Sequence, residues 1–312
     1  MKKTTFAIAA IATAIIIAAA FTSMYYGKTS GNNSSSTNAL KLPSGSVPQW
    51  QIQVSGDFSQ QESISLSLIA KMPLTDVVVT SENATYRGVA LNEFLNQTGI
   101  LWDAGPLTIV GADGQHATLN TYQAWNSTYF PYSYQYNVIV LAFIKNGQWL
   151  SSQDGGPVKL IAPHFPSSSQ VAEVNQIQSQ PWTVSITGEV ANPFELTGKN
   201  ITSFQPQTLH GAFNPGDAPN VTADWTGIPI LNLLQAAKAS SGATEISVVG
   251  VDGYTQNFTL AEVRDGAMML GYQMNGQYLP TGQGGAFRLF APTPEYKWGQ
   301  YWVKWVAEIY VC

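Results

Sequence analysis

The sequence predicts a β-rich α+β fold that is built twice in tandem. The first observation is an internal repeat, because the run Leu107–Gly114 has a close match in the run Ile246–Gly253. The second is that short runs rich in β-branched residues alternate apolar and polar side chains, which is typical of strands. The third is that helical spacing is confined to short pieces. Two domains of ordinary size, each with its own core, account for these patterns.

The repeat extends over most of the chain. Four further pairs of blocks recur in the same order: Trp50–Gly56 with Trp182–Gly188, Arg87–Leu91 with Thr226–Ile230, Asn146–Leu150 with Asn275–Leu279, and Val171–Val174 with Val306–Ile309. A chance match of five ordered blocks is improbable, and so long a period indicates a tandem of domains. We therefore predict a first repeat domain at residues 47–178 and a second at residues 179–312.

The expected elements follow from local patterns. Strands are predicted at Trp50–Val54, Asp76–Thr80, Leu107–Val110 and Val138–Phe143, and at their partners in the second repeat. Short helices are predicted around Leu91–Leu95 and over Ile230–Ala237, each just after the Gly-containing block. Tight turns are predicted at Asn146–Gly147, Asp252–Gly253 and Asn275–Gly276, because Asn, Asp and Gly adopt turn conformations at low steric cost.

The N-terminus predicts export. Lys2 and Lys3 precede an uncharged apolar run, Phe6–Tyr26, of about the 20 residues that a membrane span needs. Residues 1–26 are therefore either a transmembrane anchor or a cleaved signal, and residues 27–46 are a flexible Gly-, Ser-, Asn- and Thr-rich linker. We expect the folded part to lie outside the cytoplasm or at the cell surface, anchored to the membrane through this segment or secreted.

The amino-acid composition restricts the kinds of partner that the protein is expected to bind. Charged residues make up 11% of the chain, against about 25% in typical soluble proteins. The net charge is −5, and the 14 Lys and Arg residues are spread along the chain without a basic stripe, so nucleic acid is excluded as an expected partner. Eight N-glycosylation motifs indicate an exported glycoprotein or an Asn-rich surface that leaves them unused: Asn32, Asn33, Asn83, Asn96, Asn126, Asn200, Asn220 and Asn257.

A set of residues in the second repeat carries a family resemblance. It consists of Trp225–Ile230, Val251–Tyr254, Asn275, Gly276, Leu279, Gly285, Arg288, Leu289, Pro292, Lys304–Val306, Glu308 and Ile309. In this order and spacing the set resembles the molybdopterin-binding domain of the sulfite oxidase family, and the first repeat matches it more weakly. The resemblance implies a β-rich α+β fold, molybdopterin as cofactor, and a molybdenum ion whose sulfur ligation is completed by one Cys thiolate of the protein.

That Cys is absent from the expected segment. The family places it before the Trp-x-Gly block, where this chain has Val79–Asn83 in the first repeat and Thr208–Gly211 in the second. Cys312 is the only thiol, and we expect it to be a terminal or intermolecular thiol. A hydroxyl or amide oxygen does not replace a soft thiolate, so ordinary sulfite-oxidase chemistry loses its protein ligand.

The resemblance points to a few candidate site residues. Arg288, Lys297 and Lys304 are candidates for binding the pterin phosphate. His210 lies near the position where the family has its Cys ligand, and it is a further candidate. Trp298 and Trp302 are candidates for exposed contacts, whereas no catalytic residue and no zinc site emerge from the sequence. The expected function is that of a divergent or inactive member that binds a pterin-like ligand and works with a redox partner or surface protein. The alternative is a glycosylated structural or interaction module without catalytic activity.

Overall fold

The computed structural model describes residues 41–126, 138–163, 165–166, 169–216 and 220–312. Residues Leu42–Cys312 form one compact unit. The predicted β-rich α+β fold is confirmed, since strands dominate and the α-helices of the described residues are short. These helices are α2 (Leu66–Ile69), α3 (Leu91–Gln97), α4 (Thr121–Asn126), α5 (Ile230–Ala237) and α6 (Leu260–Asp265).

The strands fall into two sets of ten. The first set is β1 (Gln51–Ser55), β2 (Glu62–Ser65), β3 (Leu74–Val79), β4 (Ala84–Ala90), β5 (Ala104–Gly111), β6 (His116–Asn120), β7 (Val140–Lys145), β8 (Gln148–Trp149), β9 (Lys159–Ile161) and β10 (Val174–Pro181). The second set is β11 (Val184–Gly188), β12 (Phe194–Leu196), β13 (Gln207–Phe213), β14 (Val221–Pro229), β15 (Glu245–Gly250), β16 (Thr255–Thr259), β17 (Met269–Met274), β18 (Gln277–Tyr278), β19 (Arg288–Phe290) and β20 (Val306–Val311). The strands predicted around residues 50, 76, 107 and 138 and the helices at α3 and α5 are thus confirmed.

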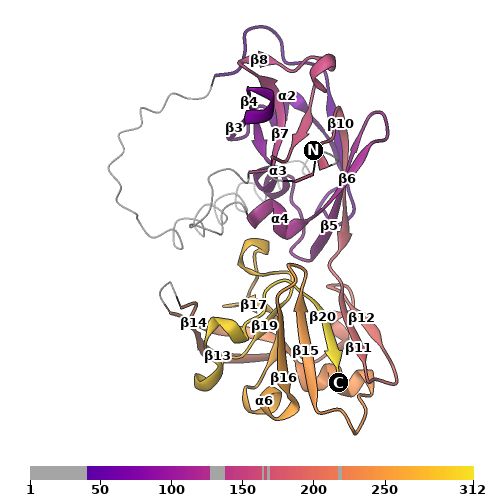
Figure 1. Ribbon diagram of the computed structural model, residues 1–312, viewed down its shortest axis with the longest axis vertical. Helices are drawn as coiled ribbons and strands as arrows, with labels where there is room; N and C mark the ends of the chain where they lie inside the picture. Colours follow the sequence, from indigo (N-terminus) through magenta and orange to yellow (C-terminus); the bar gives the residue numbers. More distant parts are fainter. Residues whose placement is uncertain (1–40, 127–137, 164, 167–168, 217–219) are drawn as a thin grey trace, which may run out of the picture. The chain divides into compact units, whose positions relative to one another are not determined.

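The two sets have the same topology, and Figure 1 labels most of their strands. One sheet of each set has the order β2-β1-β10-β5-β6 or β12-β11-β20-β15-β16. The other has the order β3-β4-β7-β8 or β13-β14-β17-β18, with β9 paired to β7 and β19 paired to β17. In both sets the opening strand pairs in parallel with the closing strand, β1 with β10 and β11 with β20. This shared topology supports the tandem repeat that the sequence blocks indicate.

A tryptophan ties the opening segment of each repeat to its closing strand. The Trp50 indole Nε1 donates to the Val174 carbonyl at 2.6 Å, and Trp182 Nε1 donates to the Val306 carbonyl at 2.7 Å. Trp182 is 2% exposed, whereas Trp50 is only partly buried. The recurrence of Trp at the start of both repeats therefore has a physical cause, which is an acceptor on the parallel strand.

Replacing Trp182 with Phe is expected to lower the free energy of unfolding by about 1–3 kcal/mol, because the buried Val306 carbonyl loses its donor. Trp50→Phe is the matched control and is expected to cost less, since solvent can reach its site. Urea unfolding monitored by circular dichroism measures both. Equal midpoints for Trp182→Phe and the unaltered protein would contradict this role of the indole.

A glycine lets two strands cross closely in each repeat. A Cβ atom at Gly88 would lie 1.9 Å from the Leu141 carbonyl oxygen, and one at Gly227 would lie 2.6 Å from the Leu270 carbonyl oxygen. Both glycines sit at a β-bulge, where the register between β4 and β7 or between β14 and β17 shifts. Only Gly fits so close an approach of two backbones, and α3 or α5 begins shortly afterwards.

The predicted Asn-Gly turns also recur with the same geometry. Asn146 and Asn275 have left-handed backbones, with φ of 50° and 52°. The Asn146 side chain accepts from the Thr85 amide and the Asn275 side chain accepts from the Asp224 amide, both at 2.9 Å. Asn is one of the few residues that adopts a left-handed backbone readily, and its side chain here secures the neighbouring strand.

The predicted match at the end of the repeats is wrong in register. The structural counterpart of Val306 is Val174, because these two carbonyls accept the two indole hydrogen bonds. The preceding residues, Glu173 and Trp305, both have φ of 49°, and their amides donate to Gly155 and Gly284 at 2.8 and 3.0 Å. The similar residue types in Val171–Val174 and Val306–Ile309 therefore do not mark equivalent positions in the two repeats. Backbone hydrogen bonding fixes the match, and residue type alone does not.

The buried residues form separate cores on either side of Trp182. One hydrophobic cluster contains buried residues from Trp182 to Val311, and two others contain buried residues from Ile52 to Ile177. Trp102 and Tyr122 pack against the later cluster, and Trp102 stacks on Tyr278 with 4.3 Å between ring centroids. Strand β10 continues to Pro181, beyond the predicted boundary at residue 178. The exact domain limits stay a prediction.

The predicted anchor or signal at residues 1–26 and most of the linker at 27–46 lie outside the described residues. Among the residues that the structure does describe, no helix is both long enough and apolar enough to span a membrane.

Candidate functional site

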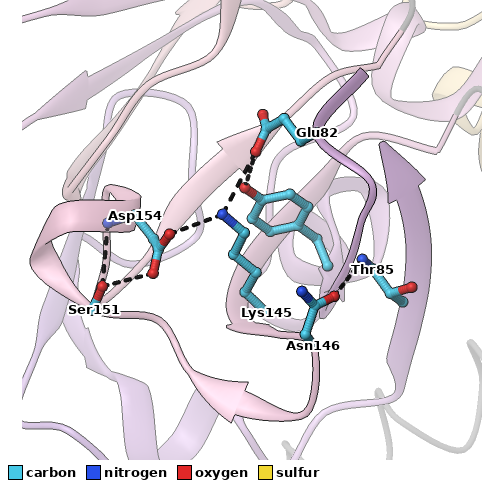
Figure 2. Close-up of polar contacts among 7 residues, drawn as sticks. Glu82, Thr85, Lys145, Asn146, Ser151 and Asp154 are labelled. Atoms are coloured by element: carbon cyan, nitrogen blue, oxygen red, sulfur yellow. Dashed lines mark hydrogen bonds and ion pairs between the residues drawn. The ribbon is translucent and has the colours of Figure 1, made fainter. Parts of the chain in front are cut away.

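In the first repeat, the segment Val79–Asn83 lacks a thiol and contributes the carboxylate of Glu82. Residues of the same repeat neutralise the charge of this carboxylate. Val79 ends β3, and the 3-10 helix η1 (Thr80–Glu82) follows. The Tyr86 hydroxyl donates to Glu82 Oε2 at 2.5 Å, and Lys145 Nζ lies 3.8 Å from the same oxygen (Figure 2). Tyr86 is fully buried on β4, directly opposite Lys145 on β7. Glu82 is thus held by two partners within the repeat.

Lys145 connects this carboxylate to a second one. Its Nζ donates to Asp154 Oδ1 at 2.8 Å, and the Ser151 hydroxyl donates to Asp154 Oδ2 at 2.7 Å (Figure 2). Asp154 ends the 3-10 helix η2 (Ser152–Asp154), whose N-cap is Ser151. The four side chains of Glu82, Tyr86, Lys145 and Asp154 form what we call the ion cluster. It joins η1, β4, β7 and η2.

Three groups of the ion cluster have pKa values that are shifted further away from neutral pH. The hydrogen bond to Asp154 raises the pKa of Lys145 to about 12, and Lys145 in turn lowers the pKa of Asp154. Burial, followed by the bond to Glu82, raises the pKa of Tyr86. Stability from Lys145 is lost only as pH rises from 10.5 through about 12, and that from Asp154 only as pH falls below 3.8. Lys145, Asp154 and Tyr86 are therefore not poised to exchange protons near pH 7, and they are suited to holding strands together.

In the second repeat, the segment Thr208–Gly211 lies on β13 and offers no free ligand. The Thr208 hydroxyl is 2.8 Å from the Thr226 hydroxyl, and Leu209 packs against the core. His210 is exposed, and its Nδ1 lies 2.8 Å from Asp224 Oδ1 on β14. A Cβ atom on Gly211 would meet the Pro292 carbonyl oxygen at 2.4 Å. The backbone of Pro292 therefore closes the direction in which a side chain at 211 would project.

Arg288 is placed in the core, away from solvent. It is 5% exposed, and its guanidinium carbon lies 4.4 Å from the Phe213 ring centroid and 5.7 Å from that of Trp302. Its Nη1 donates to the Gln283 carbonyl at 3.0 Å. Trp302 also packs on Trp225 with 4.8 Å between centroids. We call Phe213, Trp225, Phe290 and Trp302 the aromatic cluster, and Arg288 is its cation.

The ion cluster and the aromatic cluster occupy equivalent positions. Tyr86 lies opposite Lys145 as Trp225 lies opposite Met274. Lys159 pairs with Ala142 on β7 as Arg288 pairs with Gly271 on β17, and both cations lie over aromatic rings. One ancestral position has therefore become a partly exposed ion network in the first repeat and a buried aromatic core in the second.

The remaining predicted basic residues do not gather in one place with His210. Lys304 and Arg288 both approach Gly284, where an added Cβ would meet their side-chain carbons at 2.9 and 3.1 Å. Lys304 Nζ lies 5.7 Å from the Trp305 ring centroid. Lys297 Nζ lies 5.4 Å from the Trp298 ring centroid, and its carbonyl accepts from the Asn214 amide at 2.7 Å. Arg288 and Lys304 are thus neighbours, while Lys297 lies beside the chain that follows β13.

Two aromatic side chains expected at the surface differ in burial. Trp298 is 48% exposed, which agrees with its predicted role in surface contact, but Trp302 is 2% exposed, so its predicted exposure is wrong. Trp302 instead fills the aromatic cluster, and its indole donates to the Tyr296 carbonyl at 3.0 Å. Cys312 follows β20 and hydrogen-bonds through its backbone to Glu245 and Thr244. Over the part of the chain that the structure describes, no group of three His, Cys, Asp or Glu side chains is arranged to hold a metal ion.

Sequence reasoning missed the ion cluster and the burial of Arg288. Glu82 was available as a signal, since it is the only carboxylate in the vacant segment Val79–Asn83. The partners of Glu82 come from β4 and β7, and only the sheet pairing brings them to it.

Comparison with known proteins places these observations in a family. The model of the oxidoreductase molybdopterin binding domain matches residues 80–180 and again residues 171–312. The chain therefore belongs to this family, and the match occurs twice, in agreement with the sequence repeat. The resemblance predicted from the second repeat is confirmed.

One curated protein and one solved structure are similar to this chain. A curated NADPH nitrate reductase of Beauveria bassiana is 29% identical over 183 residues, which cover 49% of this chain and 18% of that protein. The chain thus matches less than a fifth of the length of that relative. The sulfane dehydrogenase SoxCD of Paracoccus pantotrophus is 12% identical, with a TM-score of 0.35, and the match covers 84% of this chain and 77% of that chain.

The residues at the family's ligand segment do not fit a molybdenum centre held by a protein thiolate. Neither segment contains sulfur, Glu82 is bound within the ion cluster, and Gly211 has no room for a side chain. His210 is the one imidazole of these segments, and its Nδ1 lies 2.8 Å from Asp224 Oδ1 at the surface. Imidazole and carboxylate do not substitute for thiolate in softness. We therefore derive no reaction step through molybdenum.

Proposed function

We propose that this chain is an exported member of the family that works without a molybdenum–thiolate centre, as a binding or interaction module at the cell surface. The observation that carries the proposal is that contacts within the protein occupy both segments where the family's ligand is expected, Val79–Asn83 and Thr208–Gly211. In the first repeat the ion cluster engages Glu82, and in the second Pro292 closes the space beside Gly211. A scaffold of this kind keeps its strands and turns when its chemistry is lost, because fold and function are separable.

The surface placement of the glycosylation motifs supports export. Five of the eight acceptor side chains are described by the structure, and all five are exposed: Asn83, Asn96, Asn200, Asn220 and Asn257. An oligosaccharide attached at these positions meets solvent and displaces no core. Together with the basic and apolar N-terminus, this favours a location outside the cytoplasm, with the segment 1–26 as membrane tether or cleaved signal.

The cofactor content of protein purified from its native host tests the proposal. Molybdenum is measured by mass spectrometry and pterin by the fluorescence of its oxidised form. We expect both below a tenth of the protein on a molar basis. One molybdenum per chain would overturn the proposal. Membrane fractionation and the shift in mass on treatment with a glycosidase test the location in the same preparation.

A second candidate function is the binding of a pterin-type ligand without a thiolate. The observation in its favour is that the aliphatic stems of Lys304 and Arg288 both reach Gly284, although the guanidinium of Arg288 is itself buried against Phe213 and Trp302. Pterin without molybdenum in the purified protein, lost in Lys304→Met and retained in Lys199→Met, would favour this candidate. Absence of pterin from the unaltered protein would rule it out.

A further inference from the structure

Two buried aspartates interact electrostatically at the start of β5, and one of them, Asp103, belongs to the loop that precedes this strand. Asp57 follows β1, Asp103 immediately precedes β5, and each is 7% exposed. The Asp57 carbonyl accepts from the Leu101 amide at 2.9 Å, and the Asp103 carbonyl accepts from the Trp182 amide at 2.7 Å. These backbone bonds hold the main chain of both residues in place, and both residues are buried.

The charge environment of this pair is unbalanced. Asp57 Oδ2 is buried and has no hydrogen-bond partner among the described residues. The Asp103 carboxyl lies against Gly198, where a Cβ would meet Asp103 Oδ2 at 2.1 Å. Within the described part of the chain, the charged groups that act on the pair are the two carboxylates themselves and the exposed ammonium of Lys199. Two negative charges and one positive charge leave one negative charge uncompensated.

Burial raises the pKa of both acids, but the interactions that accompany it differ. Burial raises the pKa of Asp57, and the neighbouring Asp103 raises it further, while Lys199 opposes both effects. Burial also raises the pKa of Asp103, but its own backbone amide favours the ionised form. Asp103 is therefore the acid that ionises more readily, and Asp57 is the acid that retains its proton more readily.

We propose that Asp57 is a neutral carboxylic acid in the folded protein and that its ionisation loosens the loop of residues 98–103. A buried carboxylate oxygen without a donor is costly, whereas a neutral acid costs far less. One proton also removes the uncompensated charge. A divalent cation is a poorer occupant, because two carboxylates beside an ammonium offer too few oxygen ligands.

The loop of residues 98–103 gives this ionisation a structural consequence. It carries Trp102, which stacks on Tyr278 with 4.3 Å between ring centroids and packs edge to face with Phe287 with 5.7 Å between ring centroids. The sign follows from the raised pKa of Asp57. Its neutral form contributes stability fully below the ordinary pKa of 3.8, and this contribution is lost as pH rises through the raised value. The protein is thus expected to hold Trp102 more firmly in acid.

Hydrogen exchange of the Leu101 amide, the donor to Asp57, tests the proposal in the full chain. After correction for the intrinsic pH dependence of exchange, we expect exchange of this amide to accelerate at least about tenfold as the pH is raised from below 3.8 to 8. Asp57→Asn mimics the neutral acid, so its corrected exchange is expected to stay constant. Asp113→Asn, an exposed residue of the same repeat, is the matched control and is expected to behave as the unaltered protein. A corrected rate that is constant in the unaltered protein would overturn the proposal.

Thermal unfolding provides a readout that does not depend on one amide. At pH 8, Asp57→Asn is expected to raise the midpoint by about 3 °C or more, and at pH 4 by less than about 1 °C. Lys199→Met removes the one nearby cation, so its loss of stability is expected to begin at a higher pH than in the unaltered protein. Stabilisation of the unaltered protein by millimolar Ca²⁺ at pH 8, abolished by Asp57→Asn, would overturn the proposal in favour of a cation site.

Discussion

Replacing Arg288 with Met is expected to lower the free energy of unfolding by about 3–5 kcal/mol, because three favourable contacts are lost together. A cation over an aromatic ring is worth about 2 kcal/mol when it is desolvated, and Arg288 lies over both Phe213 and Trp302. Its hydrogen bond to Gln283 adds about 1.5–3 kcal/mol as a bond from a charged group. Met retains the apolar stem, so the loss reports on the guanidinium.

Lys159→Met is the matched control for this experiment, since Lys159 is the counterpart of Arg288 in the first repeat. It is partly exposed and lies 5.5 Å from the single ring of Tyr86, so its replacement is expected to cost less than about 1 kcal/mol. Chemical denaturation of both variants gives the comparison. If Arg288→Met were as stable as the unaltered protein, Arg288 would not be the cation of the aromatic cluster.

Replacing Gly211 with Cys is expected to destabilise the protein by about 2–3 kcal/mol without creating a metal site. The new Cβ would lie 2.4 Å from the Pro292 carbonyl oxygen and 2.6 Å from the Pro292 Cβ, and overpacking of this kind typically costs 1–3 kcal/mol. Because β13 must move to relieve the contact, the hydrogen bond from Trp225 Nε1 to the Gly211 carbonyl, now 2.9 Å, is strained as well.

Ala212→Cys controls for the presence of a thiol on the same strand. Position 212 already carries a Cβ, so this variant is expected to lose less than about 1 kcal/mol. Thermal unfolding and molybdenum content are measured for both variants expressed in the native host. A Gly211→Cys protein that is as stable as Ala212→Cys and acquires molybdenum would contradict the view that Pro292 has closed the ligand position.

The sequence predicted those parts of the fold that local chemistry determines. Gly227 is needed where two backbones nearly touch, and Asn275 is needed where the backbone is left-handed and its amide oxygen caps a strand. Such positions admit few residue types, so they recur in both repeats and can be recognised. The Trp that opens each repeat belongs to the same group, because its acceptor lies on the paired parallel strand.

The misplaced features depend on distant partners. Similar residue types predict one match between the ends of the two repeats, whereas the backbone hydrogen bonds of Glu173 and Trp305 determine a different one. The role of Arg288 toward a pterin phosphate stays a prediction, but its burial is not visible in the sequence, because Phe213 and Trp302 approach it from other segments. Trp302 was expected at the surface for the same reason, since an aromatic residue in a loop does not reveal which core it enters.

The burial of Asp57 also cannot be predicted from the sequence alone. Asp57 and Asp103 follow different elements, and the residue that compensates part of their charge, Lys199, comes from the turn after β12. Their proximity results from sheet pairing, and their burial from the packing of the loop above them. The sequence contains three ordinary charged residues at these positions and no motif that joins them.

The most direct test of the account is a crystal structure of the protein from its native host, with anomalous scattering recorded at the molybdenum absorption edge. We expect no anomalous peak beside either ligand segment, Glu82 bound to Tyr86 and Lys145, and Pro292 against Gly211. An anomalous peak of full occupancy within bonding distance of Val79–Asn83 or Thr208–Gly211 would contradict the account.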